Sequence, residues 1–244
     1  MHTTMNQILN LYRSKYPFHS FYELASAKIM KNNALLGENY PYLVDNSSLL
    51  GLKFKANPGD IRVDLPIWFG DPSKVKLKVM ILGREPRNSH DKFNIEVSNE
   101  HNFVFGTPFG IEYWSEKNKY YRSFKNLIKN DEILTYFSDV VKTYEVKQSK
   151  TESDLHAKVS FWKKAEMEKD NLVFLKTEVD LLNPDVIIGL GNDSYNFLKK
   201  HFKSFDVQKV IHPNARQDKK SGLNAWVTAE IKISEIIKSS KSIA

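Results

Sequence analysis

The stretch Val79–Arg87, which reads VMILGREPR, starts as an apolar run and ends abruptly in a glycine, an acid between two arginines, and a proline. A short apolar, β-branched run bounded by turn-forming residues is typical of a buried strand. Glu85 follows a glycine turn and precedes Pro86, so we expect a rigid backbone at this carboxylate. The stretch therefore predicts a strand whose tip holds an acidic side chain in a fixed place.

Apolar, β-branched segments recur at four places, residues 75–83, 137–146, 185–191 and 206–213. Helical patterns lie before and after the third segment, and a further one closes the chain. Strands that alternate with helices favour an α/β domain whose parallel sheet is covered on both faces. We therefore expect a three-layer α/β/α fold with a central, mainly parallel, four-stranded sheet.

The first part of the chain has a different character. The first 35 residues read as helices, with Ile8 and Tyr12 at helical spacing, and the rest of this part is turn-rich and mostly extended. We expect residues 1–74 to form a helical and extended segment packed on the core, and residues 75–244 to form the α/β domain.

Composition excludes several classes of protein. Cysteine is absent, which excludes disulfides, iron–sulfur clusters and thiolate zinc sites. The N-terminus lacks the long apolar core of a signal peptide, and no run of about 18 apolar residues suggests a membrane span. We expect a soluble, cytoplasmic monomer with no membrane partner.

The formal net charge is +7, from 36 Lys and Arg against 29 Asp and Glu. Such an excess favours association with a polyanion, and nucleic acid is the commonest intracellular one. Lysine-rich surfaces are also common in AT-rich bacterial proteomes, so charge alone leaves this partner open. The sequence has no phosphate-loop or dinucleotide fingerprint and no convincing metal-ligand spacing, so we expect neither cofactor nor metal.

Polar or turn-forming residues lie at or near an end of each predicted strand. They are Gly83 to Pro86, Ser138-Asp139, Gly191 to Ser194, and His212 to Asn214. Ligands of open parallel sheets bind at the carboxyl ends of the strands, so polar residues gathered at one edge indicate a site. Because Ser138-Asp139 begins the second segment, it remains open whether that strand ends there.

Three of these residues carry chemistry that a site needs. Glu85 either orients a water or stabilises a developing cation, or it is a solvated acid paired with Arg84 or Arg87. Asp139 lies in an apolar strand, where a charge needs hydrogen bonds, so it either accepts them from a ligand or caps a neighbouring loop. His212 either donates to a leaving group that gains negative charge or has a structural role.

Two aromatic residues and one helix start complete the candidates. Phe105 and Phe109 lie on the glycine-rich loop after the first strand, and each either stacks on a flat heterocycle or anchors the loop in the core. Gly191 to Ser194 opens a helix, and helix N-termini favour phosphate through exposed amides and the dipole.

Taken in order, these motifs resemble the uracil-DNA glycosylase superfamily over about residues 75–235. VMILGREPR is similar to its first motif, FVFGTPFGI to the Pro-Phe loop that follows, and FSDVVKT to the strand that the four-cysteine-cluster (family 4) enzymes write as TNVVK. NPDVIIGLGNDSYNFL is similar to their Pro-x-x-Ile-x-x-Leu-Gly strand and helix, and VIHPNAR to the closing His-Pro-Ser motif. Residues 1–74 are not covered.

The resemblance implies an activity and a set of roles. Members of the superfamily flip a damaged base out of single- or double-stranded DNA and hydrolyse its N-glycosidic bond. Glu85 holds the position of the catalytic Asp of the best-known uracil enzymes, and His212 that of the histidine that stabilises the departing base. Further matches fall on base-binding positions: Gly83, Asp139, Phe109 and, as second choice, Phe105. The DNA-contacting matches are Ser194 and Asn214 for phosphate and Arg216 for the wedge that enters the helix.

Three departures from the family pattern bear on base specificity. Asp139 stands where uracil enzymes use Asn, and a carboxylate only accepts, so it suits a base that presents N–H groups, as in the hypoxanthine-removing branch. Arg87 and Asn88 replace the Tyr-His that excludes thymine. The cysteines of family 4 are missing.

The sequence thus predicts a DNA glycosylase-like hydrolase that acts on uracil or hypoxanthine. The first alternative is a catalytically inactive or repurposed member that binds nucleic acid or a nucleobase. The second is an unrelated α/β enzyme that acts on small phosphorylated metabolites.

Overall fold

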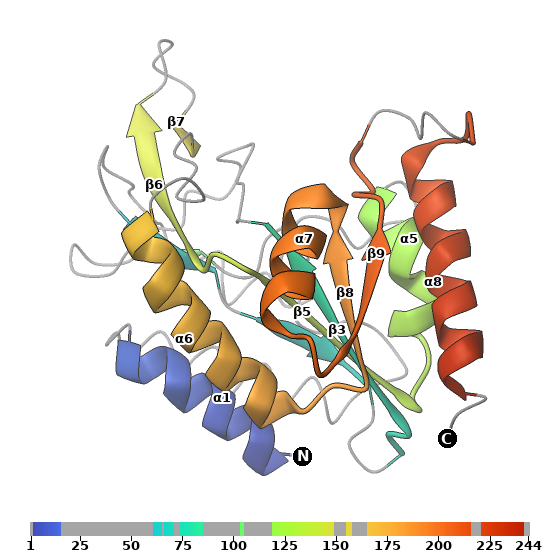
Figure 1. Cartoon of the computed structure of the whole chain (residues 1–244), viewed down its shortest axis with the longest axis horizontal. Coiled ribbons are helices and arrows are strands. Elements are labelled where there is room, and N and C mark those ends of the chain that lie inside the picture. The colour runs from blue at the N-terminus through green and yellow to red at the C-terminus, as the bar shows by residue number, and fades with distance from the viewer. Residues whose placement is uncertain are drawn as a thin grey trace, which may run out of the picture.

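The computed structural model describes residues 2–15, 61–64, 66–70, 74–84, 103–104, 119–148, 155–157, 165–215 and 221–241 of the chain. The described elements form two sheets, with helices packed around the larger one (Figure 1). Within these ranges, no helix combines the length and the apolarity needed to cross a membrane.

The larger sheet contains the predicted strands. In spatial order its strands are β2 (Ile67–Phe69), β5 (Ile133–Asp139), β3 (Leu77–Gly83), β8 (Val186–Leu190) and β9 (Asp206–Val210). The last four are parallel, and β2 pairs antiparallel with β5. The predicted α/β fold with a mainly parallel sheet is confirmed, with one strand more than expected. The additional strand β2 is only three residues long, too short for its sequence pattern to show.

The apolar segment 137–146 belongs to two strands rather than one. β5 ends at Asp139, and β6 (Thr143–Gln148) begins after a turn. Val140 and Val141 in that turn are buried, which explains why the apolar run continues through it. β6 belongs to the second sheet, whose order is β4 (Phe103–Val104), β1 (Ile61–Asp64), β6 and β7 (Leu155–Ala157). Asp139 is therefore the last residue of its strand, at the carboxyl end.

Helices cover both faces of the larger sheet. They are α1 (His2–Lys15), α5 (Lys119–Ile128), α6 (Ala165–Leu182), α7 (Gly191–His201) and α8 (Ala225–Lys241). α1 packs against α6 and α5 against α8, and Figure 1 shows the two pairs on opposite sides of the sheet. α5 lies in the connection from β3 to β5, and α7 lies in the connection from β8 to β9, which runs the opposite way along the sheet. Because such connections are right-handed, α5 and α7 lie on opposite faces, which places α7 on the α6 side. The three-layer arrangement is confirmed.

The helices bury the residues that their periodicity predicts. Ile8 and Tyr12 of α1 are fully buried, and so are Leu175 and Val179 of α6. α6 ends before Asn183, whose φ of 47° is left-handed, and a proline follows. The remainder of the helical segment expected in the first 35 residues lies outside the described residues.

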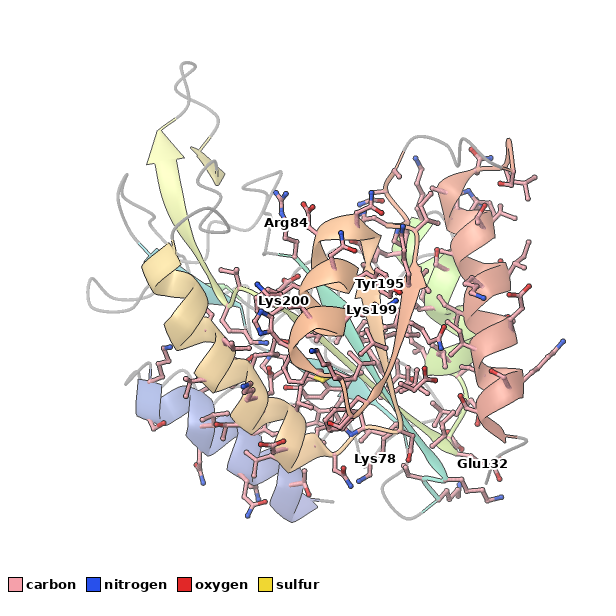
Figure 2. All side chains as sticks on the ribbon, in the orientation of Figure 1. Lys78, Arg84, Glu132, Tyr195, Lys199 and Lys200 are labelled. Carbon is pink, nitrogen blue, oxygen red and sulfur yellow. The ribbon has the colours of Figure 1, made fainter. Side chains whose placement is uncertain are left out.

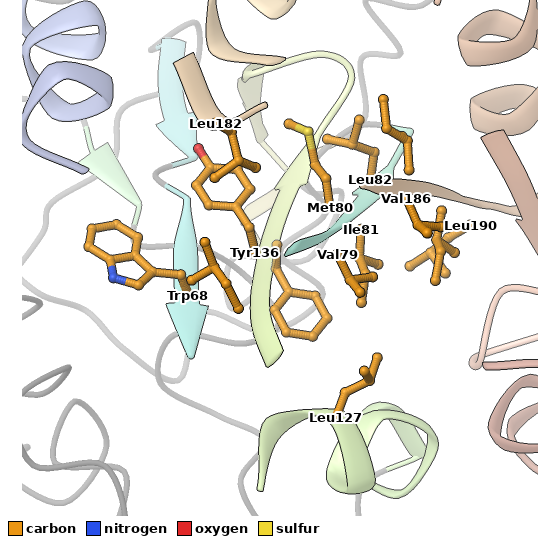
Figure 3. Packing of buried hydrophobic residues seen from close by; sticks show 14 of the residues in the cluster. Trp68, Val79, Met80, Ile81, Leu82, Leu127, Tyr136, Leu182, Val186 and Leu190 are labelled. Atoms are coloured by element: carbon orange, nitrogen blue, oxygen red, sulfur yellow. The ribbon is translucent and has the colours of Figure 1, made fainter. Parts of the chain in front are cut away.

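β3 lies at the centre of the core. Val79, Met80, Ile81 and Leu82 are each at most 1% exposed, because helices cover both faces of the sheet. Their side chains alternate, and Figure 3 shows Met80 and Leu82 on one side of the strand and Val79 and Ile81 on the other. Residues Val79–Leu82 of the opening stretch thus form the buried part of a strand that ends at Gly83, at one edge of the sheet.

Candidate functional site

The strand order reverses direction between β3 and β8, which makes this position the topological switch point of the sheet. The chain moves from β3 to β5 on one side and then returns past β3 to β8 and β9 on the other. In open α/β sheets, ligands bind at such a point, outside the carboxyl ends of the strands. The tip of β3, which leads directly into Glu85, therefore lies at the expected site.

Gly83 and Asp139 face each other at the carboxyl ends of β3 and β5, where they are partners in the strand register. The Asp139 carboxylate occupies the space that a Cβ at position 83 would need, so a larger residue there would displace this carboxylate. Asp139 is 8% exposed. The pairing continues past the strands, since the Val140 amide donates to the Gly83 carbonyl at 3.0 Å and the Val141 amide to that of Arg84 at 3.0 Å. These bonds hold the backbone that leads to Glu85.

Successive side chains of β5 point to opposite faces of the sheet, one covered by α5 and the other by α6. Phe137 packs edge-on against Phe124 of α5, with ring centroids 5.2 Å apart, whereas Tyr136 contacts Glu178 of α6. Asp139 is two residues after Phe137, so it lies on the α5 side of the sheet. The sequence left open whether a strand ends at Ser138-Asp139, and the structure ends β5 at Asp139. The role of Asp139 in a site stays a prediction.

An ion pair spans the switch point. Arg84 Nη1 lies 2.8 Å from Asp193 Oδ2 in the first turn of α7, and Figure 2 shows Arg84 beside that turn. Both side chains are partly exposed, so the pair contributes little to global stability. It does hold the β3 tip against α7.

His212 follows β9 and has both ring nitrogens in hydrogen bonds. The Asn214 backbone amide donates to Nδ1 at 3.3 Å, and Nε2 is hydrogen-bonded to the Tyr120 hydroxyl. A backbone amide can only donate, so Nδ1 is the acceptor and the ring is the neutral form with its proton on Nε2. The turn is closed by the Ala215 amide, which donates to the His212 carbonyl at 2.8 Å. His212 is thus a preorganised hydrogen-bond donor.

The two predicted phosphate contacts differ in exposure. Asn214 is exposed, whereas Ser194 is fully buried, with its hydroxyl lacking a hydrogen-bond partner among the described residues. α7 begins at Gly191, whose φ is 85°, so Ser194 lies in its first turn. The Ser194 hydroxyl therefore faces the protein interior. A phosphate contact by this hydroxyl would require the first turn to shift, and it stays a prediction.

A family model described as the Uracil DNA glycosylase superfamily matches residues 69–232, well over half of the chain. The chain belongs to this superfamily. Membership carries a glycosylase-like function in general, with DNA as the substrate. A search of the curated proteins found no match.

Other predicted site residues of this superfamily member are not placed. Glu85, Phe105, Phe109 and Arg216 lie outside the described residues, and their roles stay predictions. The chain has no cysteine, so its residues do not fit the four-cysteine cluster of family 4. In the parts that the structure describes, no three His, Asp or Glu side chains are grouped to hold a metal.

A buried polar network lies behind the rim, on the α6 side of the superfamily domain. Lys142 Nζ and Glu178 Oε2 are 2.5 Å apart, and both side chains are completely buried. Glu178 Oε1 accepts from the hydroxyls of Tyr12 at 2.8 Å and Tyr136 at 2.5 Å. Lys142 also donates to Ser138 Oγ at 2.7 Å. The network thus ties α1 and α6 to the residue that precedes Asp139.

Burial sets the protonation of this network. Desolvation, with the Glu178 charge as the next cause, raises the pKa values of Tyr12 and Tyr136 well above the usual 10. Both hydroxyls therefore stay protonated donors at neutral pH, which a buried carboxylate needs. Sequence reasoning missed these residues and also Tyr120. The one available signal was Lys142, a cation directly after an apolar run.

Proposed function

We propose that the chain is a monofunctional DNA glycosylase that hydrolyses the N-glycosidic bond of a deaminated base, uracil or hypoxanthine, flipped out of DNA. The observation that carries the proposal is the placement of Asp139 and His212 at one edge of the sheet, beside the β3 tip that leads into Glu85. Superfamily membership supports base excision as the chemistry. We further propose that the protein acts as a cytoplasmic monomer without a cofactor.

In the proposed reaction, the bond between the sugar C1′ and the base nitrogen breaks, and its electron pair leaves with the base. The sugar becomes an oxocarbenium-like cation, to which a water adds at C1′ while the proton of this water passes to the Glu85 carboxylate. The Glu85 carboxylate supports the cation and orients this water. A neutral imidazole whose Nε2 carries the proton supports the negative charge on the departing base without transferring that proton.

Asp139 is the proposed base-selecting residue. Its carboxylate is buried against Gly83, so it approaches a ligand with acceptor oxygens at a fixed position. A carboxylate repels the exocyclic oxygens of uracil and suits a base edge that presents N–H groups. This chemistry favours hypoxanthine over uracil.

A basic surface on α7, β9 and the turn between them supports DNA as the polymer. The exposed lysines of α7, β9 and the turn between them are Lys199, Lys200, Lys203 and Lys209. Lys199 Nζ and Lys209 Nζ lie 5.5 Å and 5.9 Å from the centroid of the Tyr195 ring, and Figure 2 shows Tyr195 and Lys199 together on α7. Two cations held at one ring create a local positive field that favours a phosphate backbone.

The proposal is tested by an excision assay on labelled single- and double-stranded oligonucleotides that carry uracil, hypoxanthine or xanthine, with alkali to reveal abasic sites. We expect excision by the wild-type protein and a loss of about 100-fold or more in Glu85→Gln, since one positioned acid–base group contributes about that much. DNA affinity should remain, because the substitution removes no phosphate contact.

Two results would count against a glycosylase. Equal excision by Glu85→Gln and wild type would remove Glu85 from the mechanism. Silence on every substrate, with salt-sensitive DNA binding intact, would favour a repurposed binder, because phosphate contacts make nucleic-acid affinity fall steeply with salt. The observation that favours this second candidate is Asp139 in place of the family Asn.

Asp139→Asn is expected to shift base preference toward uracil by about tenfold or more, since one matched hydrogen-bond pair discriminates by about 1–3 kcal/mol. The measurement is the ratio of kcat/KM values for uracil and hypoxanthine in the same duplex. Asp185→Asn is the matched control, because Asp185 accepts from the Lys78 amide at the opposite edge of the sheet. A ratio unchanged in Asp139→Asn would exclude this residue from base recognition.

A further inference from the structure

Tyr120 is buried at the same sheet edge as the candidate site and contacts His212. It is the second residue of α5, the helix that starts from the carboxyl end of β3, so it lies at the rim rather than deep in the layer. It is 5% exposed, and its ring meets the His212 ring edge-on, with centroids 5.2 Å apart and an interplanar angle of 88°. α5 covers the side of the sheet on which Asp139 lies.

The hydrogen bonds of His212 define what the Tyr120 hydroxyl does. Because the Asn214 amide donates to Nδ1, the ring has one proton, on Nε2, and Tyr120 Oη accepts it. The single N–H of His212 is therefore already in use. For His212 to donate directly to a base, this hydrogen bond would have to break inside a buried site, which is unfavourable because it leaves a buried polar group without its partner.

A phenol that accepts a hydrogen bond keeps its own proton and becomes a stronger donor. Hydrogen bonds in a chain polarise one another, so an imidazole N–H that donates to Tyr120 Oη strengthens donation from the same hydroxyl. In this arrangement the Tyr120 hydroxyl donates to a group that gains negative charge at this edge, and the His212 imidazole donates to the Tyr120 oxygen. Such fixed donors contribute most where water is excluded.

We propose that Tyr120 is a catalytic residue of this site, and that its hydroxyl relays the donor strength of His212 to the departing base. The inference rests on the proposed glycosylase function. The base leaves with the electron pair of the glycosidic bond, and its charge is stabilised by a hydrogen bond from Tyr120 O–H. The tyrosine and histidine protons both stay in place, so the step requires no oxidant and transfers no group.

The test compares Tyr120→Phe, His212→Asn and the double variant in single-turnover excision. Tyr120→Phe keeps the ring and removes only the hydroxyl, so we expect the excision rate to fall about 100-fold, as for the loss of one oxyanion donor, with substrate KM nearly unchanged. Because the two side chains act in series, the double variant should be no slower than the slower single variant. Tyr121→Phe is the matched control, a buried tyrosine on the same helix.

The inference would be overturned if Tyr120→Phe excised at the wild-type rate, or if the losses of the two single variants multiplied in the double variant. A nuclear magnetic resonance spectrum of the His212 ring nitrogens gives a readout that does not depend on activity. We expect an Nε2 proton protected from solvent exchange in the wild type and exposed to exchange in Tyr120→Phe. Equal exchange in the two proteins would overturn the contact itself. Excision absent from the wild type would overturn the glycosylase function, while the Nε2 signal would still decide whether Tyr120 holds His212.

Discussion

Lys142→Met is expected to lower the free energy of unfolding by about 3–5 kcal/mol, the range for removing one partner of a buried ion pair. The substitution keeps most of the side-chain volume but removes the ammonium group that lies 2.5 Å from Glu178 Oε2. Glu178 is completely buried and would then hold its charge with only hydroxyl donors. Urea unfolding followed by circular dichroism measures the change.

Two further variants make this test specific. Lys76→Met breaks an ion pair of the same 2.5 Å length to Glu132, but those side chains are 72% and 42% exposed, so we expect a change below about 1 kcal/mol. Combining Lys142→Met with Glu178→Gln should recover part of the loss, because a neutral amide still accepts from Tyr12 and Tyr136 and leaves no bare charge. Similar losses for Lys142→Met and Lys76→Met would contradict the argument from burial.

Gly189→Ala is expected to lower the free energy of unfolding by about 3 kcal/mol, at the upper end for overpacking. A Cβ on this β8 residue would lie 2.7 Å from both the amide nitrogen and the Cα of Tyr195 and 3.1 Å from the carbonyl carbon of Ser194. These are backbone atoms of α7, so no rotamer change relieves the overlap. The helix must move away from the sheet, and its first turn moves away from Arg84.

Gly222→Ala provides the comparison for this second variant. A Cβ there meets no atom within 4 Å, but φ is +71°, so only backbone strain of about 1–2 kcal/mol is expected. Thermal unfolding of the two variants beside the wild type separates the effect of contact from that of strain. A loss in Gly189→Ala no larger than that in Gly222→Ala would show that α7 is not closely packed on β8.

Most of the fold was predictable because three of its parallel strands, β3, β5 and β8, are buried on both faces. Such strands appear as continuous apolar runs, as in Val79–Leu82, and the helices between them keep a regular period, as in α6. Burial also explains why residues 137–146 were predicted as one strand although they belong to β5 and β6. Val140 and Val141 are as buried as strand residues, so composition carried no sign of the turn after Asp139.

The candidate site was predictable only where its residues end strands. His212 could be placed at the rim from its position after the last predicted strand, whereas the sequence left open whether a strand ends at Asp139. Tyr120 could not be placed, because its partner His212 is 92 residues away and no local pattern connects them. The contacts of Tyr12 in the buried network span even longer separations and depend on the packing of α1 against α6. Contacts of this kind follow from tertiary structure, which periodicity does not encode.

The contact of α1 with α6 has a consequence for the order in which the chain can fold during synthesis. Tyr12 leaves the ribosome early, but its partners Ser138 and Glu178 follow 126 and 166 residues later. Until α6 emerges, Ile8 and Tyr12 lack the α6 side chains that pack against α1 in the native structure. The beginning of the chain is therefore among the last parts of the core to reach its native neighbours.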